Sequence, residues 1–270
     1  MAKRGLWSKL FVSREFGDLI DAAPKPSGTL DYDPWGFNYE ATKTAFGAFR
    51  LIYEKYFRVK THGLEHIPAS GRCLIIGNHS GQLPIDGILV GYALATNPAG
   101  PRIPRTMIER FFPSVPFLGN ALNQVGAVVG EPANCRKMLE SDEAIIVFPE
   151  GVRGSGKPYR KRYQLQRFGN GFMHLAIDHR TPIIPVGIVG CEETIPALGS
   201  ITPLARMLGL PYLPVAFPFP LPARVILNFG APMHFGHADS EAEITANVEA
   251  VKRALEALIA KGLDERKSVF

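Results

Sequence analysis

The stretch CLIIGNHSGQLPIDG, residues 73–87, contains an apolar run followed by a polar loop rich in glycine and proline. The apolar run, residues 73–76, is typical of a strand that is buried on both faces of a sheet. His79 follows this strand, and Asp86 comes seven residues later. We expect the loop to turn back so that the Asp86 carboxylate orients the His79 imidazole, a candidate general base. Asp86 is also suited to cap the next helix, and the two roles are compatible.

A second apolar run, residues 144–147, ends in the sequence FPEGVR, residues 148–153. Glu150, Gly151 and Arg153 therefore stand just after a predicted strand, as the histidine does in the first motif. The carboxyl ends of parallel strands meet at one edge of a sheet. We therefore expect the two loops to form one shared site.

Basic residues are concentrated after this second loop, at Lys157, Arg160, Lys161, Arg162 and Arg167. Such a cluster suits a phosphate group or a polyanionic surface, although a solvated basic loop would have the same composition. Arg105 and Arg110 flank a predicted strand between the two motifs. Either arginine is a candidate to reach the same pocket from the adjacent strand.

Apolar runs alternate with helical patterns along most of the chain. We expect strands at residues 58–61, 72–77, 104–108, 125–129, 143–148, 183–189 and 224–229. We expect helices at residues 86–96, 111–122, 134–141, 168–179 and 240–261. This alternation predicts an α/β fold with a mostly parallel central sheet flanked by helices. The organisation we expect is an N-terminal segment over residues 1–57, a main domain over residues 58–262 and a tail over residues 263–270.

The N-terminal segment contains an amphipathic helical pattern over residues 38–57. Its apolar positions recur at intervals of three and four residues, with Lys43, Arg50 and Glu54 on the opposite face. Such a helix either covers the sheet of its own domain or lies on a membrane surface. We find no signal peptide, and prolines break the uncharged stretch of residues 207–223, so we expect no transmembrane helix.

The same proline-rich stretch carries large apolar side chains at Leu208, Leu210, Tyr212 and Leu213. It is too long and too apolar for an ordinary surface loop. It therefore either covers an edge of the core or lines a hydrophobic channel.

Charge and cysteine content limit the partners of the chain. Its 270 residues include 30 basic and 25 acidic ones, which gives a formal net charge of +5. This excess favours an anionic partner, such as a membrane surface or a phosphorylated substrate. The sequence has none of the motifs typical of nucleic-acid binding, so we expect no nucleic-acid partner. Its three cysteines have no disulfide or metal-binding spacing, so we expect no metal site.

With these residues in view, the chain resembles the glycerolipid acyltransferases typified by bacterial 1-acyl-glycerol-3-phosphate acyltransferase. The resemblance covers about residues 57–233 and rests on four blocks in the family's order. These blocks are Asn78–His79 with Asp86, residues 105–130, residues 148–153 and residues 184–187. The chain departs from the family pattern twice. Six residues instead of four separate His79 from Asp86, and Val152 stands where the family usually has threonine.

The resemblance implies a fold like that of glycerol-3-phosphate acyltransferase and a reaction that needs no metal or bound cofactor. His79 would deprotonate an acceptor hydroxyl, which would attack the thioester of acyl-CoA or acyl carrier protein directly. The expected acceptor is a lysophospholipid, most simply 1-acyl-glycerol-3-phosphate. The residues expected to bind it are Glu150, Gly151 and Arg153, with help from Arg105 or Arg110.

The same resemblance implies a cytoplasmic protein that lies peripherally on the inner face of a membrane. Three alternatives stay open from the sequence. The acceptor could be a neutral mono- or diacylglycerol, the enzyme could hydrolyse acyl esters or thioesters, or the chain could bind lipid without catalysis.

Overall fold

The computed structural model describes residues 11–24, 32–80, 84–114, 118–200, 214–216 and 219–270. The predicted channel residues Leu208, Leu210, Tyr212 and Leu213 lie outside these ranges. The strands are β1 (Lys60–His62), β2 (Cys73–Gly77), β3 (Arg105–Ile108), β4 (Ala127–Val129), β5 (Ala144–Val147), β6 (Ile183–Val189), β7 (Ala197–Ser200), β8 (Pro214–Ala216) and β9 (Ile226–Phe229).

Helical segments connect most of these strands. The longer ones are α2 (Arg14–Asp21), α3 (Tyr39–Leu51), α4 (Ile85–Ala95), α5 (Leu118–Gln124), α6 (Pro132–Glu140), α8 (Gly171–Asp178) and α11 (Glu241–Glu265). The short ones are α7 (Val152–Ser155), α9 (Cys191–Thr194), the π-helical turn η1 (Ile52–Tyr56) and the 3₁₀ turns η2 (Leu64–His66), η3 (Phe112–Ser114) and η4 (Tyr159–Lys161).

The central sheet has seven strands in the order β1-β9-β6-β2-β5-β3-β4. All neighbouring pairs are parallel except β6 and β9, which are antiparallel. The predicted α/β fold with a mostly parallel sheet is therefore confirmed, and each predicted strand overlaps one strand of this sheet. The sequence did not predict α2, the short helices α7 and α9, or the separate hairpin of β7 and β8.

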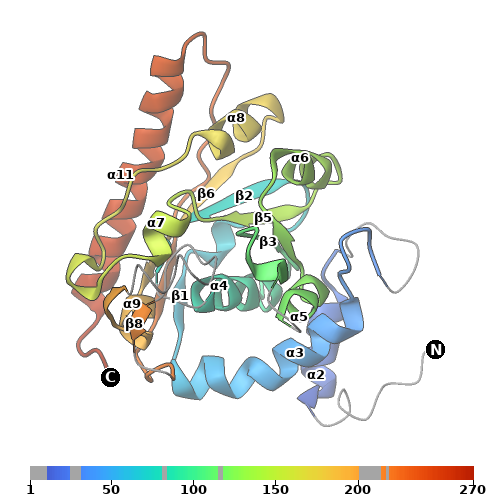
Figure 1. Cartoon of the computed structure of the whole chain (residues 1–270). Helices are drawn as coiled ribbons and strands as arrows, with labels where there is room; N and C mark the ends of the chain where they lie inside the picture. Colours follow the sequence, from blue (N-terminus) through green and yellow to red (C-terminus); the bar gives the residue numbers. More distant parts are fainter. Residues whose placement is uncertain (1–10, 25–31, 81–83, 115–117, 201–213, 217–218) are drawn as a thin grey trace.

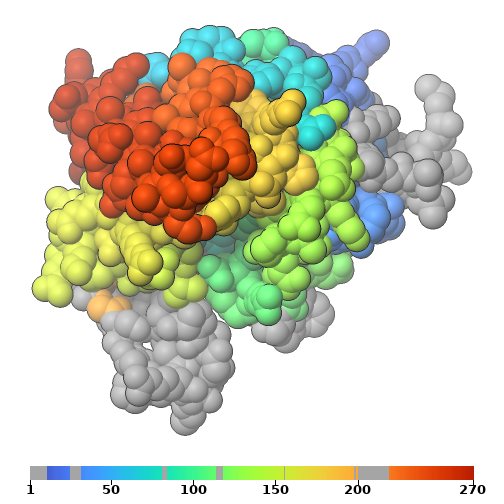
Figure 2. Space-filling model, turned by 90° about the horizontal axis from the view of Figure 1, so that it is seen from above, coloured from blue at the N-terminus to red at the C-terminus, as the bar shows by residue number. Residues whose placement is uncertain are grey.

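Helices cover both faces of the sheet (Figure 1). Helices α2, α3 and α4 pack on the face to which Cys73 and Ile75 of β2 belong, while α6, α8 and α11 pack on the face of Leu74 and Ile76. The two cores alternate along β2 because successive side chains of a strand point to opposite faces. In Figure 2 the C-terminal helix, in red, lies beside the yellow-green segment that follows β5.

The predicted N-terminal amphipathic helix packs on its own domain. Phe46 of α3 and Tyr53 of η1 place their rings 5.7 and 4.3 Å from the ring centroid of Tyr92 in α4. Lys43, expected on the polar face, is instead buried, and its ammonium lies 2.6 Å from Asp21 of α2. The buried face of this helix therefore covers its own domain, which is the first of the two alternatives that the sequence left open.

Arg105 does not lie where the resemblance placed it. It is the first residue of β3, at the amino end of the strand, and its side chain is fully buried. Its guanidinium group forms ion pairs with Asp33 and Glu143 and lies 4.5 Å from the ring centroid of Phe37. Arg105 therefore attaches the N-terminal segment to the sheet and is not positioned to hold a phosphate of the acceptor.

We predict that Arg105→Met lowers the free energy of unfolding by about 3–5 kcal/mol, because it leaves two buried carboxylates without their cation. Urea denaturation followed by circular dichroism measures this loss. Arg110→Ala is the matched control, because Arg110 is exposed and its pair with Glu131 should contribute less than about 1 kcal/mol. An Arg105→Met protein that keeps its full stability but binds the acceptor more weakly would contradict this assignment and indicate that Arg105 binds the acceptor.

Candidate active site

The structure brings His79 and Asp86 together at the carboxyl edge of the sheet. Nδ1 of His79 lies 2.6 Å from Oδ2 of Asp86, and the Ser80 amide donates to the same oxygen at 2.9 Å. Asp86 is fully buried in the first turn of α4, where the helix dipole favours a negative charge. The six residues between His79 and Asp86 thus allow the carboxylate to reach the imidazole, as the sequence predicted.

The surroundings of His79 favour its protonated form. Burial by itself lowers the pKa of His79, but Asp86, with a smaller contribution from Glu150, raises this pKa above its ordinary value of 6.5, against an opposing effect of Lys157. A carboxylate at Nδ1 selects the tautomer whose proton is on Nδ1. Nε2 is then the nitrogen that can accept a proton. The imidazole also stacks on Phe148, with 4.7 Å between ring centroids and 19° between planes.

Glu150 contacts the backbone of the loop that carries His79. Its buried side chain accepts a hydrogen bond from the His79 amide at 2.9 Å and another from the Gln166 amide at 2.7 Å. The carboxylate therefore joins the loop after β2 to the segment that follows α7. The expected role of Glu150 in acceptor binding stays a prediction; in this structure its carboxylate engages two backbone amides.

A buried lysine compensates the charge of Glu150. Nζ of Lys157 lies 3.8 Å from Glu150 and 3.1 Å from Glu192 of α9, and all three side chains are buried. Burial raises the pKa of Glu192, and Lys157 opposes that rise. Sequence analysis missed Glu192, although it lies in the short helix α9 that follows the apolar strand β6. The rule that located the other two loops, charged residues after a buried strand, would have found it.

Two glycines let α7 lie against these side chains. A Cβ atom at Gly154 would come within 2.7 Å of the Cβ atoms of both His79 and Glu150. Gly151 adopts a φ of +54°, and a Cβ atom there would lie 3.1 Å from Oε1 of Glu109. The expectation that Gly151 binds the acceptor stays a prediction; its backbone conformation and its neighbour Glu109 explain why this position favours glycine.

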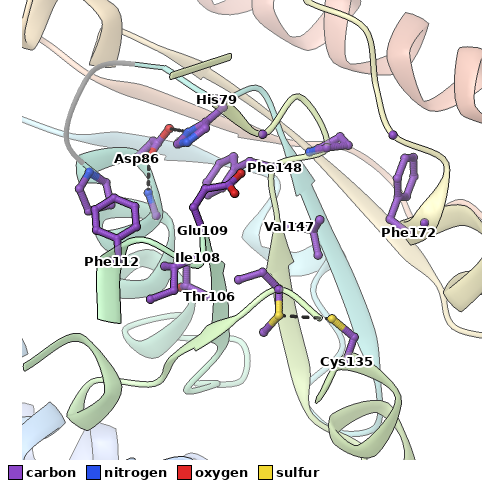
Figure 3. Close-up of a pocket in the computed structure, with 18 of the residues that line it drawn as sticks. His79, Asp86, Thr106, Ile108, Glu109, Phe112, Cys135, Val147, Phe148 and Phe172 are labelled. Carbon is purple, nitrogen blue, oxygen red and sulfur yellow. Dashed lines mark hydrogen bonds and ion pairs between the residues drawn. The ribbon is translucent and has the colours of Figure 1, made fainter. Parts of the chain in front are cut away.

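A cavity of about 270 Å³ opens beside His79 and extends between β3, β5, α6 and α8 (Figure 3). Most of its lining is apolar. The side chains farther from His79 include Met107, Cys135, Val147, Phe172 and Leu175. Glu109, His79 and Asp86 are the charged or basic groups among the described residues that line it, and no lysine or arginine does so.

The predicted cations therefore lie around the cavity and not in it. Arg153 is exposed on α7, and Arg110 is exposed beside Glu131. Arg160, Lys161, Arg162 and Arg167 are also exposed, whereas Lys157 is buried in the ion-pair network. In the described part of the chain, no group of three metal-binding side chains is placed to hold a metal ion.

Residues 58–189, which contain both loops of the site, match the family model described as Acyltransferase. The human protein named "DGAT1/2-independent enzyme synthesizing storage lipids" is 31% identical over 236 residues, which cover 84% of this chain and 68% of the human protein. This chain belongs to the acyltransferase family.

Two further comparisons extend the match. An uncharacterized protein of Mycobacterium leprae is 34% identical over 219 residues, which cover 77% of this acyltransferase-family chain and 60% of the mycobacterial protein. The crystal structure of the 1-acyl-sn-glycerophosphate acyltransferase PlsC from Thermotoga maritima aligns with a TM-score of 0.51 and 20% identity. The alignment covers 80% of this chain and 82% of the PlsC chain, and it shows a shared fold.

We predict that Asp86→Asn lowers acyl transfer by about 10²–10⁴-fold and moves the acid limb of its pH profile to lower pH. A histidine that acts as a general base must be neutral, so we expect activity to fall as pH decreases through the raised pKa of His79. Removing the carboxylate removes the main cause of that rise. Measuring kcat/KM from about pH 5 to 9 tests this sign. An acid limb that stays in place in the variant would show that Asp86 does not control His79.

Proposed function

We propose that this protein is an O-acyltransferase that moves a fatty acyl group from a thioester to a hydroxyl of a glycerolipid. The observation that carries the proposal is the His79–Asp86 pair at the mouth of an apolar cavity, within the region that matches the family. The donor is acyl-CoA or acyl carrier protein, as the family resemblance implies. Both donors present the same thioester to the site.

In the proposed reaction, Nε2 of His79 accepts the proton of the acceptor hydroxyl while its oxygen attacks the thioester carbonyl carbon. The new C–O bond forms, and the C–S bond then breaks. The leaving thiolate takes the proton from His79, so the products are an ester and a free thiol. Asp86 stabilises the imidazolium that exists between these two proton transfers. No covalent acyl-enzyme is needed.

We place the acyl chain in the cavity between β3, β5, α6 and α8. Its lining of Val147, Phe172 and Leu175 suits a hydrocarbon chain, which gains free energy when it leaves water. This location replaces the predicted channel at residues 208–213, which lies outside the described residues. Gly171 lines the cavity at the start of α8, and a Cβ atom there would meet nothing within 4 Å.

We predict that Gly171→Leu shifts the preference of the enzyme toward shorter acyl chains, because the new side chain fills space that the donor would use. Each excluded methylene should change the ratio of kcat/KM values by about tenfold or more. A series of acyl donors of increasing length measures the shift. Gly236→Leu is the control, because Gly236 also has open space but lies outside this cavity. Equal profiles for both variants would remove the acyl chain from this cavity.

Membrane contact is a further part of the proposal. No helix in the described part of the chain is long and apolar enough to cross a membrane. Leu51, Ile52, Tyr56 and Phe219 are exposed, and the Tyr56 hydroxyl donates to the carbonyl of Pro220, which brings η1 beside residue 219. These side chains support a peripheral position on a membrane, and the family resemblance implies its inner face. Co-flotation with anionic vesicles tests it, and Leu51→Asp should weaken the binding.

We predict that the wild type, incubated with a long-chain acyl-CoA and mixed glycerolipid acceptors, forms a new ester detectable by mass spectrometry. His79→Gln should form it at least about 100-fold more slowly, because the variant lacks the base. His174→Gln, at an exposed histidine, should behave as the wild type does.

Two results would contradict this function. Free fatty acid as the sole product, even with excess acceptor, would indicate a hydrolase that uses the same pair on water. Lipid binding without any product, with acyl-CoA and with acyl carrier protein as donor, would indicate a binding module.

A further inference from the structure

Glu109 is a carboxylate that the proposed chemistry does not yet use. It directly follows β3 at the carboxyl edge of the sheet and lines the cavity beside His79. Figure 3 shows its carboxylate next to Phe148, whose ring stacks on His79. Within the described residues, no hydrogen bond or ion pair engages this carboxylate, whereas Asp86, Glu150 and the other buried carboxylates near the site are paired.

An unpaired carboxylate is costly beside an apolar cavity unless a ligand supplies a hydrogen-bond donor. The neighbouring backbone leaves room for such a ligand. Gly151 has no side chain to cover Oε1 of Glu109, and any Cβ atom there would lie 3.1 Å from that oxygen. The fold therefore keeps one acceptor group open toward the cavity.

The charge around this cavity opposes a phosphate. Asp86 is balanced by its hydrogen bond with His79, so Glu109 is the uncompensated charge among the described lining residues. Arg105 is buried in another ion-pair network, and Arg110 and Arg153 do not line the cavity. A phosphorylated acceptor would bring two negative charges toward this carboxylate, and no lysine or arginine is among the described residues that line the cavity.

We propose that Glu109 is a specificity-determining residue that selects an uncharged acceptor carrying a second hydroxyl beside the reacting one, as in a monoacylglycerol. Its carboxylate accepts a hydrogen bond from the second hydroxyl while His79 deprotonates the first. The same carboxylate repels a phosphate at that position. This inference rests on the proposed acyl transfer and names the class of acceptor for it.

The test is a competition between two acceptors with the same acyl chain, a monoacylglycerol and a 1-acylglycerol-3-phosphate, under saturating acyl donor. The wild-type protein should favour the monoacylglycerol in kcat/KM by at least about tenfold. Glu109→Gln keeps an oxygen acceptor but removes the charge, so the ratio should fall toward one while the KM for the donor stays constant. Glu109→Lys should reverse the preference. Glu140→Gln, an exposed glutamate on α6, is the control and should keep the wild-type ratio.

Two results would overturn the inference while acyl transfer itself stands. One is a wild type that acylates both acceptors but prefers the phosphorylated one. The other is a ratio of kcat/KM values for the two acceptors that neither Glu109→Gln nor Glu109→Lys changes. If these variants also raise the KM for the acyl donor, the carboxylate binds amide groups of the donor instead of the acceptor. If the wild type esterifies neither acceptor, nor any other glycerolipid, the proposed function fails and the inference falls with it.

Discussion

The site depends on one buried carboxylate, that of Glu150. Its two oxygens accept hydrogen bonds from the amides of His79 and Gln166, so it fixes the loop after β2 against the segment after α7. A buried charge of this kind persists only when it is paired. Lys157 is the cationic partner of Glu150, and it also pairs with Glu192, which follows β6. Loops at the ends of three neighbouring strands are thereby held in one arrangement around the imidazole.

The molecule uses a second buried network for a different purpose. Arg105 joins Asp33 and Glu143 at the amino end of β3, where it attaches the N-terminal segment to the sheet. Glu109 stands at the other end of the same short strand and faces the cavity. Two ionisable residues four positions apart thus lie at opposite edges of the sheet. Arg105 belongs to a buried ion-pair network, and Glu109, for which we propose a role in acceptor choice, lines the cavity at the carboxyl edge, where parallel sheets bind ligands.

The strands and the His79–Asp86 pair could be predicted from the sequence, whereas the positions of Arg105 and Glu109 at opposite edges of the sheet could not. Apolar runs such as residues 183–189 identified the central strands of the sheet, because strands buried on both faces have few polar positions. The pairing of His79 with Asp86 was expected because glycine and proline in the intervening loop favour a turn over a continuous helix. Arg105 was misplaced because charge and proximity in sequence do not specify the edge of the sheet a side chain occupies. Glu109 was missed because a lone glutamate beside arginines resembles an ordinary surface residue.

The central claim is that Asp86 orients His79 as a base with a free Nε2. The most direct measurement is ¹⁵N NMR of the imidazole nitrogens during a pH titration, with the His79 signals assigned by their loss in His79→Gln. The structure predicts that neutral His79 carries its proton on Nδ1 and titrates with a pKa above its ordinary value of 6.5. A neutral form protonated on Nε2, or a midpoint at or below the ordinary value, would contradict the account.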